Sequence, residues 1–308
     1  MGNVVVLGSL NYDCQAVVEE FPRPGETLFA RSLDFNLGGK GANQAVAAAR
    51  QGAQVAMIGC VGDDSAGQAY IEYLARRGIQ TGGIVVREEE STGTAMILVR
   101  KRDGENTIVV GAGANGTLTP ADVEAQQPWV AMGRIMLTQF EVPLDCVVAG
   151  LKLARAMGTA TCLNPSPWRK DFPWGEMEQD FVITNQEEAA ALLGRNAWSL
   201  TDDKWVLPKL QEMRIDTLII TRGGASTMVF STTHRCLEYP TMEVAPVDTV
   251  GAGDCFAGPF AARWAEERDF VRSVQAANIA GALSTLERGA QEAIPPKEAV
   301  DELLSNLA

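Results

Sequence analysis

The chain has 308 residues, 46% of them hydrophobic, and a formal net charge of −13. This length and composition suit the buried core of one large α/β domain and exclude a disordered chain. The negative charge argues against nucleic acid or an anionic membrane as a partner, and an anionic substrate would need local positive groups or backbone dipoles.

The cysteines, the histidine and the N-terminus narrow the classes of function further. The six cysteines include no C-x-x-C pair, so we expect reduced thiols and a cytoplasmic protein. The first residues lack the basic head and apolar run of a signal peptide, and no apolar stretch reaches the ~20 residues that span a bilayer. The single histidine, His234, lies in a polar stretch, so a multi-histidine metal site is impossible and a Ser-His-Asp triad would depend on this one residue.

Strand and helix patterns alternate along most of the chain. Short apolar runs predict strands at 3–8, 54–59, 134–138, 159–163, 181–184 and 216–221. Helical patterns, several of them closed by glycine, are found at 39–51, 65–77, 144–157 and from Cys255 onward. This order predicts an α/β fold in which helices cover both faces of a mostly parallel central sheet, within a single domain spanning residues 1–308.

Two segments interrupt this alternation. Residues 14–35 have no helical pattern, and residues 94–100 and 106–110 read as the two strands of a hairpin. Together they predict a small β-sheet built from insertions at about 12–37 and 92–110. Because the insertions emerge at strand ends, where α/β proteins bind ligands, we expect a lid; a decorative edge hairpin is the alternative.

The stretch from Asp248 to Asp254 carries the clearest chemical signal. Gly251, Ala252 and Gly253 form a small-residue turn at the start of a predicted helix, whose free N–H groups and positive dipole end favour an anion. Asp254 would repel a phosphate, but it could accept a proton from a hydroxyl that attacks one. The turn therefore indicates phosphoryl transfer to an alcohol, with helix capping as the alternative role of Asp254.

Two glycine-rich segments match nucleotide-binding motifs only superficially. Residues 111–116 fit G-x-G-x-x-G, but the run before them belongs to the predicted hairpin and not to a βαβ unit. Residues 37–41 resemble a P-loop, but Lys40 is followed by glycine, and Asp34 stands where the first glycine belongs. We expect neither segment to bind a nucleotide in the manner of its motif.

A cluster of hydrogen-bond donors and acceptors is predicted near the ends of the first strand and of the lid. Its members are Asn11, Asp13, Gly39, Lys40 and Asn43. Such a set suits a polyhydroxylated ligand, because each hydroxyl wants a donor and an acceptor. Taken singly, these residues could equally be turn residues, a solvated helix start and a surface amide. Glu141 could bind a further hydroxyl or cap the helix that follows Pro143.

Two later strands also end in polar residues. Asn185 and Glu188 form a capping-box-like pattern, which explains them locally, although a carboxylate there could also hold Mg²⁺ through water. Thr221 and Gly223 lie in a small-residue turn that would suit nucleotide phosphates or ribose.

Five motifs occur in the order and spacing of a known family, namely 8–13, 38–49, 62–64, Asn185-x-x-Glu188 and 248–254. In these motifs the chain resembles the ribokinase family of carbohydrate kinases. The resemblance covers essentially the whole chain, from Val4 to about Pro295. The resemblance implies a central sheet with flanking helices and a β-lid that often pairs with the lid of a second subunit, giving a homodimer. It also implies ATP as co-substrate, Mg²⁺, and a monovalent cation such as K⁺.

By matching positions, the resemblance assigns roles to individual residues. It makes Asp254 the catalytic base and places the anion hole at Gly251, Ala252 and Gly253. It places the sugar among Asn11, Asp13, Gly39, Lys40, Asn43 and Glu141. It places ATP near Asn185, Thr221, Gly223 and Asn278, and Mg²⁺ near Glu188. It places the monovalent cation among oxygens near Asp248, Val250, Ser284 and Gly289.

Some residues depart from the family pattern. Ala293 stands where a serine hydroxyl commonly serves the monovalent cation, and Ser226 replaces the glycine that usually closes the turn at 223–225. Trp168, Trp174 and Trp205 are not expected from the family, and packing is their simplest explanation.

The implied activity is ATP-dependent phosphorylation of a sugar's primary hydroxyl, with D-ribose to D-ribose 5-phosphate as the best single choice. Asn11, as a polar residue, favours a substrate that carries a 2-hydroxyl. A family kinase for deoxyribose, a nucleoside or another pentose or hexose is one alternative. A sugar-binding regulatory module without catalysis is a distant one.

Overall fold

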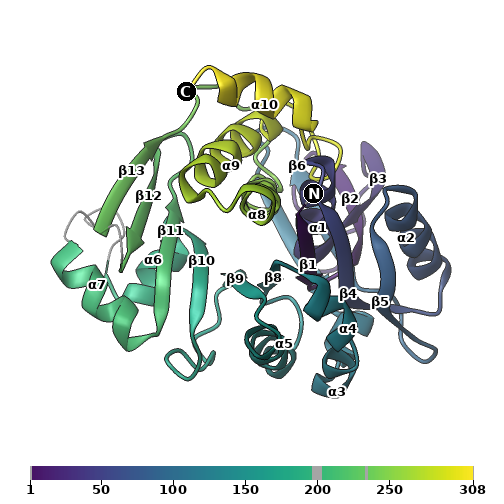
Figure 1. The fold of residues 1–308 in the computed structure, drawn as a ribbon. Coiled ribbons are helices and arrows are strands. Elements are labelled where there is room, and N and C mark those ends of the chain that lie inside the picture. Colours follow the sequence, from purple (N-terminus) through teal and green to yellow (C-terminus); the bar gives the residue numbers. More distant parts are fainter. Residues whose placement is uncertain (1, 196–202, 233–234, 308) are drawn as a thin grey trace.

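The computed structural model describes residues 2–195, 203–232 and 235–307. Within them a nine-stranded sheet has the order β13-β12-β11-β10-β9-β8-β1-β4-β5 (Figure 1). The strands from β11 to β5 are parallel, and β12 and β13 complete one edge in antiparallel fashion. Their bounds are β1 Asn3–Leu7, β4 Gln54–Gly62, β5 Gln80–Arg87, β8 Ile135–Gln139, β9 Ala160–Asn164, β10 Gln179–Asn185, β11 Ile215–Thr221, β12 Ser226–Ser231 and β13 Arg235–Pro240.

Helices cover both faces of this sheet, as predicted. One face packs on α1 Lys40–Arg50, α2 Ser65–Arg76, α8 Asp254–Glu267, α9 Phe270–Ser284 and α10 Lys297–Ser305. The other packs on α3 Pro120–Glu124, α4 Gln127–Met132, α5 Leu144–Ala156, α6 Gln186–Leu193 and α7 Asp203–Glu212. In β1, Val4 and Val6 belong to one buried core and Val5 and Leu7 to the other, because successive strand residues point to opposite faces.

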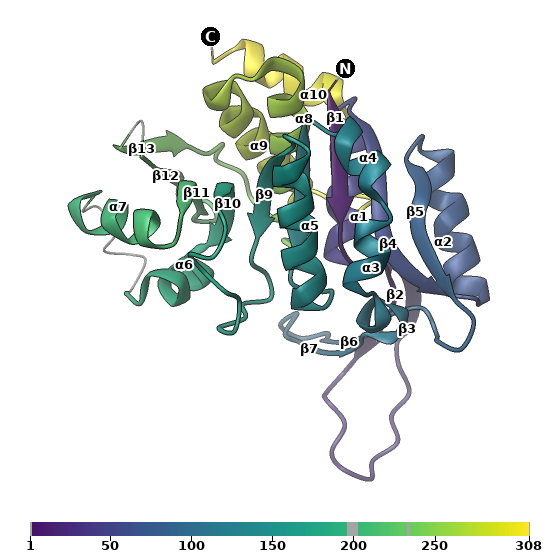
Figure 2. The same cartoon turned by 60° about the horizontal axis from the view of Figure 1, so that its bottom comes forward.

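A second, four-stranded sheet lies apart from the first and has the order β3-β2-β6-β7. It consists of β2 Asn11–Val18, β3 Ser32–Gly38, β6 Thr94–Arg100 and β7 Asn106–Gly111, the two segments in which a separate small sheet was predicted. We call this sheet the lid. Figure 2 shows the loop between β2 and β3 extending away from the body of the molecule.

The ends of the predicted elements match the structure to within about three residues, and the α/β fold class is confirmed. The strand β5 was not predicted, because Gly82 and Gly83 interrupt its apolar pattern. The structure explains Gly83: a Cβ there would lie 2.7 Å from the backbone oxygen of Met57 on the neighbouring strand. The antiparallel pair β12–β13 and the short helices α3 and α4 were also missed, since none has a strong period of its own.

Two further sequence predictions concern cysteines and membranes. All six cysteines are free thiols in the structure. No helix in the described part of the chain combines the length and apolar character that crossing a bilayer requires. His234 lies outside the described residues.

Candidate active site

Asp254 is the first residue of α8 and lies at the centre of a network of amide side chains. It is only 5% exposed. One carboxylate oxygen accepts a hydrogen bond from Asn43 Nδ2 (3.1 Å), and the other accepts one from Gln44 Nε2 (3.0 Å). Both donors lie on α1, which packs directly against α8. The structure therefore holds the Asp254 carboxylate in one orientation, and Asp254 makes no cap of its own helix.

The turn before Asp254 has the form that anion binding requires. The first helical hydrogen bond runs from Cys255 N to Gly251 O (2.8 Å), so the amides of Gly253 and Asp254 precede it and can face an anion. Gly251 has φ +74°, and a Cβ there would lie 2.9 Å from the Cβ of Ala290. Only glycine fits that position without strain.

Asn11 and Asp13 lie side by side in the lid strand β2, not in a turn. Asn11 is 5% exposed, and Asp13 Oδ1 is buried without a hydrogen-bond partner. Burial and, to a smaller extent, the nearby Glu141 carboxylate raise the pKa of Asp13 to about 7, against the opposing effect of a hydrogen bond from the Ala95 backbone. Gly39, with φ +87°, brings the start of α1 against this strand, where a Cβ would lie 2.9 Å from Asn11 N.

Lys40 and Glu141 lie between the lid residues Asn11 and Asp13 and the Asp254 carboxylate. Glu141 Oε2 accepts hydrogen bonds from Ser9 Oγ (2.5 Å) and from the backbone N–H of Lys40 (2.9 Å). It does not cap α5, whose N-cap residue is Pro143 and which has no side-chain cap, so that alternative was wrong. The carboxylate of Asp254 raises the pKa of Lys40 above its usual value against the effect of burial, and Glu141 and Glu188 add to the rise. Lys40 is thus a half-buried cation among three carboxylates.

Two adjoining cavities meet at the turn. One, of about 550 Å³, is lined by eight of the predicted residues: Lys40, Asn185, Glu188, Thr221, Gly223, Gly251, Gly253 and Asp254. The other, of about 220 Å³, is more apolar and has Ala252, Phe256 and Asn278 in its wall. Thr221, Gly223, Thr249 and Gly253 line both. The arrangement can hold a long ligand with an apolar end in the smaller cavity and an anionic part at the amides of the turn.

Asn185 and Glu188 form the capping box that their spacing predicted. Asn185 Oδ1 accepts from Glu188 N (2.8 Å), and Glu188 Oε2 accepts from Asn185 N (3.0 Å). Glu188 is 8% exposed and lines the larger cavity, so its second carboxylate oxygen can serve a ligand.

The residues predicted for a monovalent cation are only partly brought together. Asp248 accepts hydrogen bonds from the backbone N–H groups of Val250 and Gly289, each at 3.0 Å. Ser284, by contrast, donates to Gly281 O within its own helix (2.9 Å). Asp248 therefore ties the turn before α8 to the loop at Gly289. No cluster of three or more metal-binding side chains occurs in residues 2–195, 203–232 and 235–307.

Comparison with known proteins decides the family. Residues 1–297 match the sequence model of the pfkB family of carbohydrate kinases. The chain belongs to this family. It is 35% identical to a ribokinase from Haemophilus influenzae over 98% of both chains, and 30% identical to a deoxyribokinase from Salmonella typhi over 98% of this chain and 99% of that one. Its structure superimposes on that of an Arabidopsis thaliana ribokinase complexed with ribose and ATP with a TM-score of 0.90, at 25% identity and over 98% of each chain.

Several residues of this carbohydrate kinase were missed at the sequence level. Gln44 contacts Asp254, and Gln139 Nε2 donates to Gln44 Oε1 (2.5 Å). Gln291 Nε2 donates to Asn43 Oδ1 (2.9 Å) and to the hydroxyl of Tyr70 (3.0 Å). Gln44 directly follows Asn43 within a quoted motif and could have been found there. Gln291 offers no such signal, since it lies 248 positions from its partner.

Of the residues that departed from the family pattern, Ser226 and the three tryptophans have local explanations. Ser226 is the first residue of β12, and its hydroxyl contacts Arg222 and Glu238, which closes the turn without glycine. The rings of Trp168 and Trp174 stack with centroids 6.0 Å apart and pack against the core, and Arg195 lies over the ring of Trp205. Packing therefore accounts for the tryptophans.

Proposed function

We propose that this pfkB family kinase transfers the γ-phosphoryl group of ATP to the primary hydroxyl of D-ribose. The observation that carries the proposal is the position of Asp254. Its carboxylate is fixed by Asn43 and Gln44, and it lines the larger cavity at the end of the anion turn. The resemblance to ribokinases, one of them solved with ribose and ATP, supports D-ribose as the acceptor.

In the proposed reaction, the primary hydroxyl oxygen attacks the γ-phosphorus while its proton passes to Asp254. The bond between this phosphorus and the oxygen that bridges it to the β-phosphate breaks, and ADP leaves with the electron pair. The amides of Gly253 and Asp254, at the positive end of α8, stabilise negative charge on the phosphoryl group, and the Lys40 cation lines the same cavity. Asn11 and Asp13 supply a donor and an acceptor for ring hydroxyls.

Glu188 is the residue we assign to Mg²⁺. Its carboxylate is buried and faces the larger cavity. A single carboxylate suits Mg²⁺, because this ion keeps most of its waters and binds mainly substrate phosphates. Bound there, Mg²⁺ would neutralise negative charge on the phosphates. For K⁺, the proposed donors are oxygens near Asp248, Val250, Ser284 and Gly289. With Ala293 in place of a serine and Ser284 turned toward its own helix, we expect weak activation.

The first experiment measures ADP release from Mg-ATP with D-ribose, 2-deoxy-D-ribose, other pentoses, hexoses and nucleosides, with and without K⁺. Strong turnover with D-ribose is expected. The Asp254→Asn variant should keep its thermal unfolding temperature and lose ~10²–10⁴-fold in kcat. Turnover with only another sugar would keep the chemistry and reject ribose, and a near-normal rate for the variant would remove Asp254 as the base.

The second candidate acceptor is 2-deoxy-D-ribose, because a deoxyribokinase is among the relatives at 30% identity. The two acceptors differ by one hydroxyl, so the same assay separates them. The buried Asn11 amide favours the sugar that carries this hydroxyl, since an unpaired buried polar group disfavours an analogue that lacks the partner.

We further propose that the chain works as one domain that dimerises through the lid, in a reducing, cytoplasmic environment. In the lid register, Cys14 pairs with both Phe35 and Met96, and Met96 pairs with Val109, so these side chains share one face. Phe35, Met96 and Val109 are 55%, 59% and 63% exposed. Asp13 points to the opposite face, toward Glu141. An apolar outer face of this kind suits a second copy of the same lid.

A further inference from the structure

The glycine-rich segment 111–116 matches a nucleotide motif only in its letters, yet it lies against the proposed sugar site. Residues Gly113–Thr117 form the short 3₁₀ helix η1, and Asn115 within it is 1% exposed. Asn115 Oδ1 accepts a hydrogen bond from Leu10 N (2.9 Å), and its Nδ2 donates to Leu10 O (3.0 Å). The same nitrogen donates to Asn11 Oδ1 (2.9 Å). Asn115 thus holds both the backbone before Asn11 and the Asn11 side chain.

This contact fixes which end of the Asn11 amide a ligand meets. The oxygen of Asn11 is already bonded to Asn115, so the nitrogen is the end left for a ligand. No group in the described part of the chain accepts a hydrogen bond from that nitrogen, although Asn11 is 5% exposed. A donor that the protein itself leaves unpaired is available to a ligand, and a sugar hydroxyl oxygen would accept a hydrogen bond from it.

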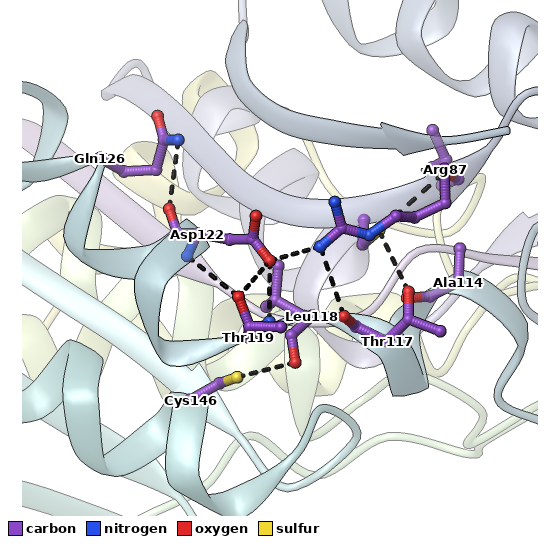
Figure 3. A network of polar contacts seen from close by, with 10 residues as sticks. Arg87, Ala114, Thr117, Leu118, Thr119, Asp122, Gln126 and Cys146 are labelled. Atoms are coloured by element: carbon purple, nitrogen blue, oxygen red, sulfur yellow. Dashed lines mark hydrogen bonds and ion pairs between the residues drawn. The ribbon is translucent and has the colours of Figure 1, made fainter.

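The surroundings hold Asn115 in place from two sides. Figure 3 shows the polar network at the C-terminal end of η1: Arg87 donates to Thr117 O (3.4 Å) and to Asp122 Oδ2 (2.5 Å), and Cys146 Sγ contacts Leu118 O (3.1 Å). On the other side lies Gly93, where a Cβ would be 2.2 Å from Asn115 Nδ2. Neither η1 nor the residue opposite it can shift without breaking these contacts.

We propose that Asn115 is a positioning residue that presents the Asn11 amide as a hydrogen-bond donor and thereby selects acceptors with a hydroxyl at C2. This inference rests on the proposed function, since it concerns how the same site tells D-ribose from 2-deoxy-D-ribose. A site built around a buried donor discriminates strongly against the analogue that lacks the matching oxygen.

The test compares Asn115→Asp with the wild-type enzyme. The carboxylate cannot donate to Asn11, and it draws the Asn11 nitrogen toward itself and away from the sugar. We expect KM for D-ribose to rise about 10- to 100-fold, with KM for ATP and for 2-deoxy-D-ribose nearly unchanged, so the preference for ribose falls by the same factor. Asn3→Asp is the matched control, because Asn3 donates to Met132 O at the start of β1, outside the site, and this variant should keep wild-type kinetics.

Two further measurements keep the proposal open to refutation. In an Asn11→Ala background, Asn115→Asp should add no further rise in KM for ribose, because the group that it positions is gone. If Asn115→Asp does not fold, Asn115→Ala removes the same donation and is read in the same way. An equal loss for both sugars, an unchanged ribose preference, or a full effect in the Asn11→Ala background would overturn the proposal. If the wild-type enzyme turns over neither sugar, the proposed function fails instead.

Discussion

At the scale of single residues, the site contains buried polar groups whose partners are incomplete. Asp13 Oδ1 has no hydrogen-bond partner, and the Asp13 pKa is raised to about 7. Most buried polar groups in folded proteins are paired, so an unpaired group marks a place where a ligand supplies the missing contact. Such a group lowers the stability of the free protein and raises its affinity for a ligand that supplies the missing contact. Because Asp13 ionises, both the stability and the affinity depend on pH.

We predict that binding of D-ribose weakens below pH 7. The ionised Asp13 carboxylate can accept hydrogen bonds from the sugar through both oxygens, and protonation near pH 7 removes part of that capacity. KM for ribose should therefore rise as pH falls from about 8 to 6, while KM for ATP should not. The Asp13→Asn variant should have a higher KM that no longer varies with pH. A parallel pH dependence in this variant would assign the effect to another group.

The same pKa predicts a difference in stability. The folded protein holds the Asp13 proton up to about pH 7, whereas the unfolded chain loses it near the ordinary aspartate pKa of 3.8. Between these values the unfolded state binds fewer protons, so stability falls as pH rises through this window and stays low above it. Asp13→Asn should consequently unfold at a higher temperature than the wild-type enzyme at pH 8 and lose that advantage at pH 4. Thermal melts at both pH values would check the sign.

At the scale of elements, the turn before α8 depends on glycine for two separate reasons. Gly251→Ala places a side chain in the left-handed backbone region and against Ala290. Gly158→Ala, at φ +72° with no neighbour within 4 Å, imposes similar backbone strain alone. Gly158→Ala should lose about 1 kcal/mol of stability, and Gly251→Ala should lose more because of its contact with Ala290. Only Gly251→Ala should also lower kcat, by about 10²-fold, because it shifts the amides that face the phosphoryl group. Equal kcat values for the two variants would show that the turn tolerates displacement.

The sequence patterns predicted most helices and strands and the chemistry of the turn before Asp254. They did not predict the contacts between residues that are distant in the sequence. The anion turn and Asp254 could be read locally, because glycine and a helix start have fixed physical meanings. The roles of Asn115 and Gln291 could not, since each contacts the site from over 100 positions away and neither belongs to a periodic pattern. The assignment of individual residues to sugar, nucleotide and ions stays a prediction that the assays above address.

At the scale of the whole molecule, the exposed apolar face of the lid predicts a homodimer. Met96→Glu places a charge in the centre of that face and should yield monomers in light scattering or sedimentation. Met132→Glu is the matched control, because Met132 is equally exposed at 59% but lies on α4, away from the lid. This variant should remain a dimer. A wild-type protein that is strictly monomeric would end the proposal.

The lid strands have one more consequence, which follows from their two faces. β2 carries Asn11 and Asp13, and β3 runs through Gly38 directly into α1, where Lys40 and Asn43 lie. On the outer side, the same strands carry Cys14 and Phe35 of the apolar face. The two faces of the same strands therefore couple the proposed dimer contact to the proposed sugar site. Substitutions that alter the backbone of the lid at the dimer contact should also shift the sugar-binding residues. We expect changes in acceptor specificity to accompany changes in quaternary structure during evolution.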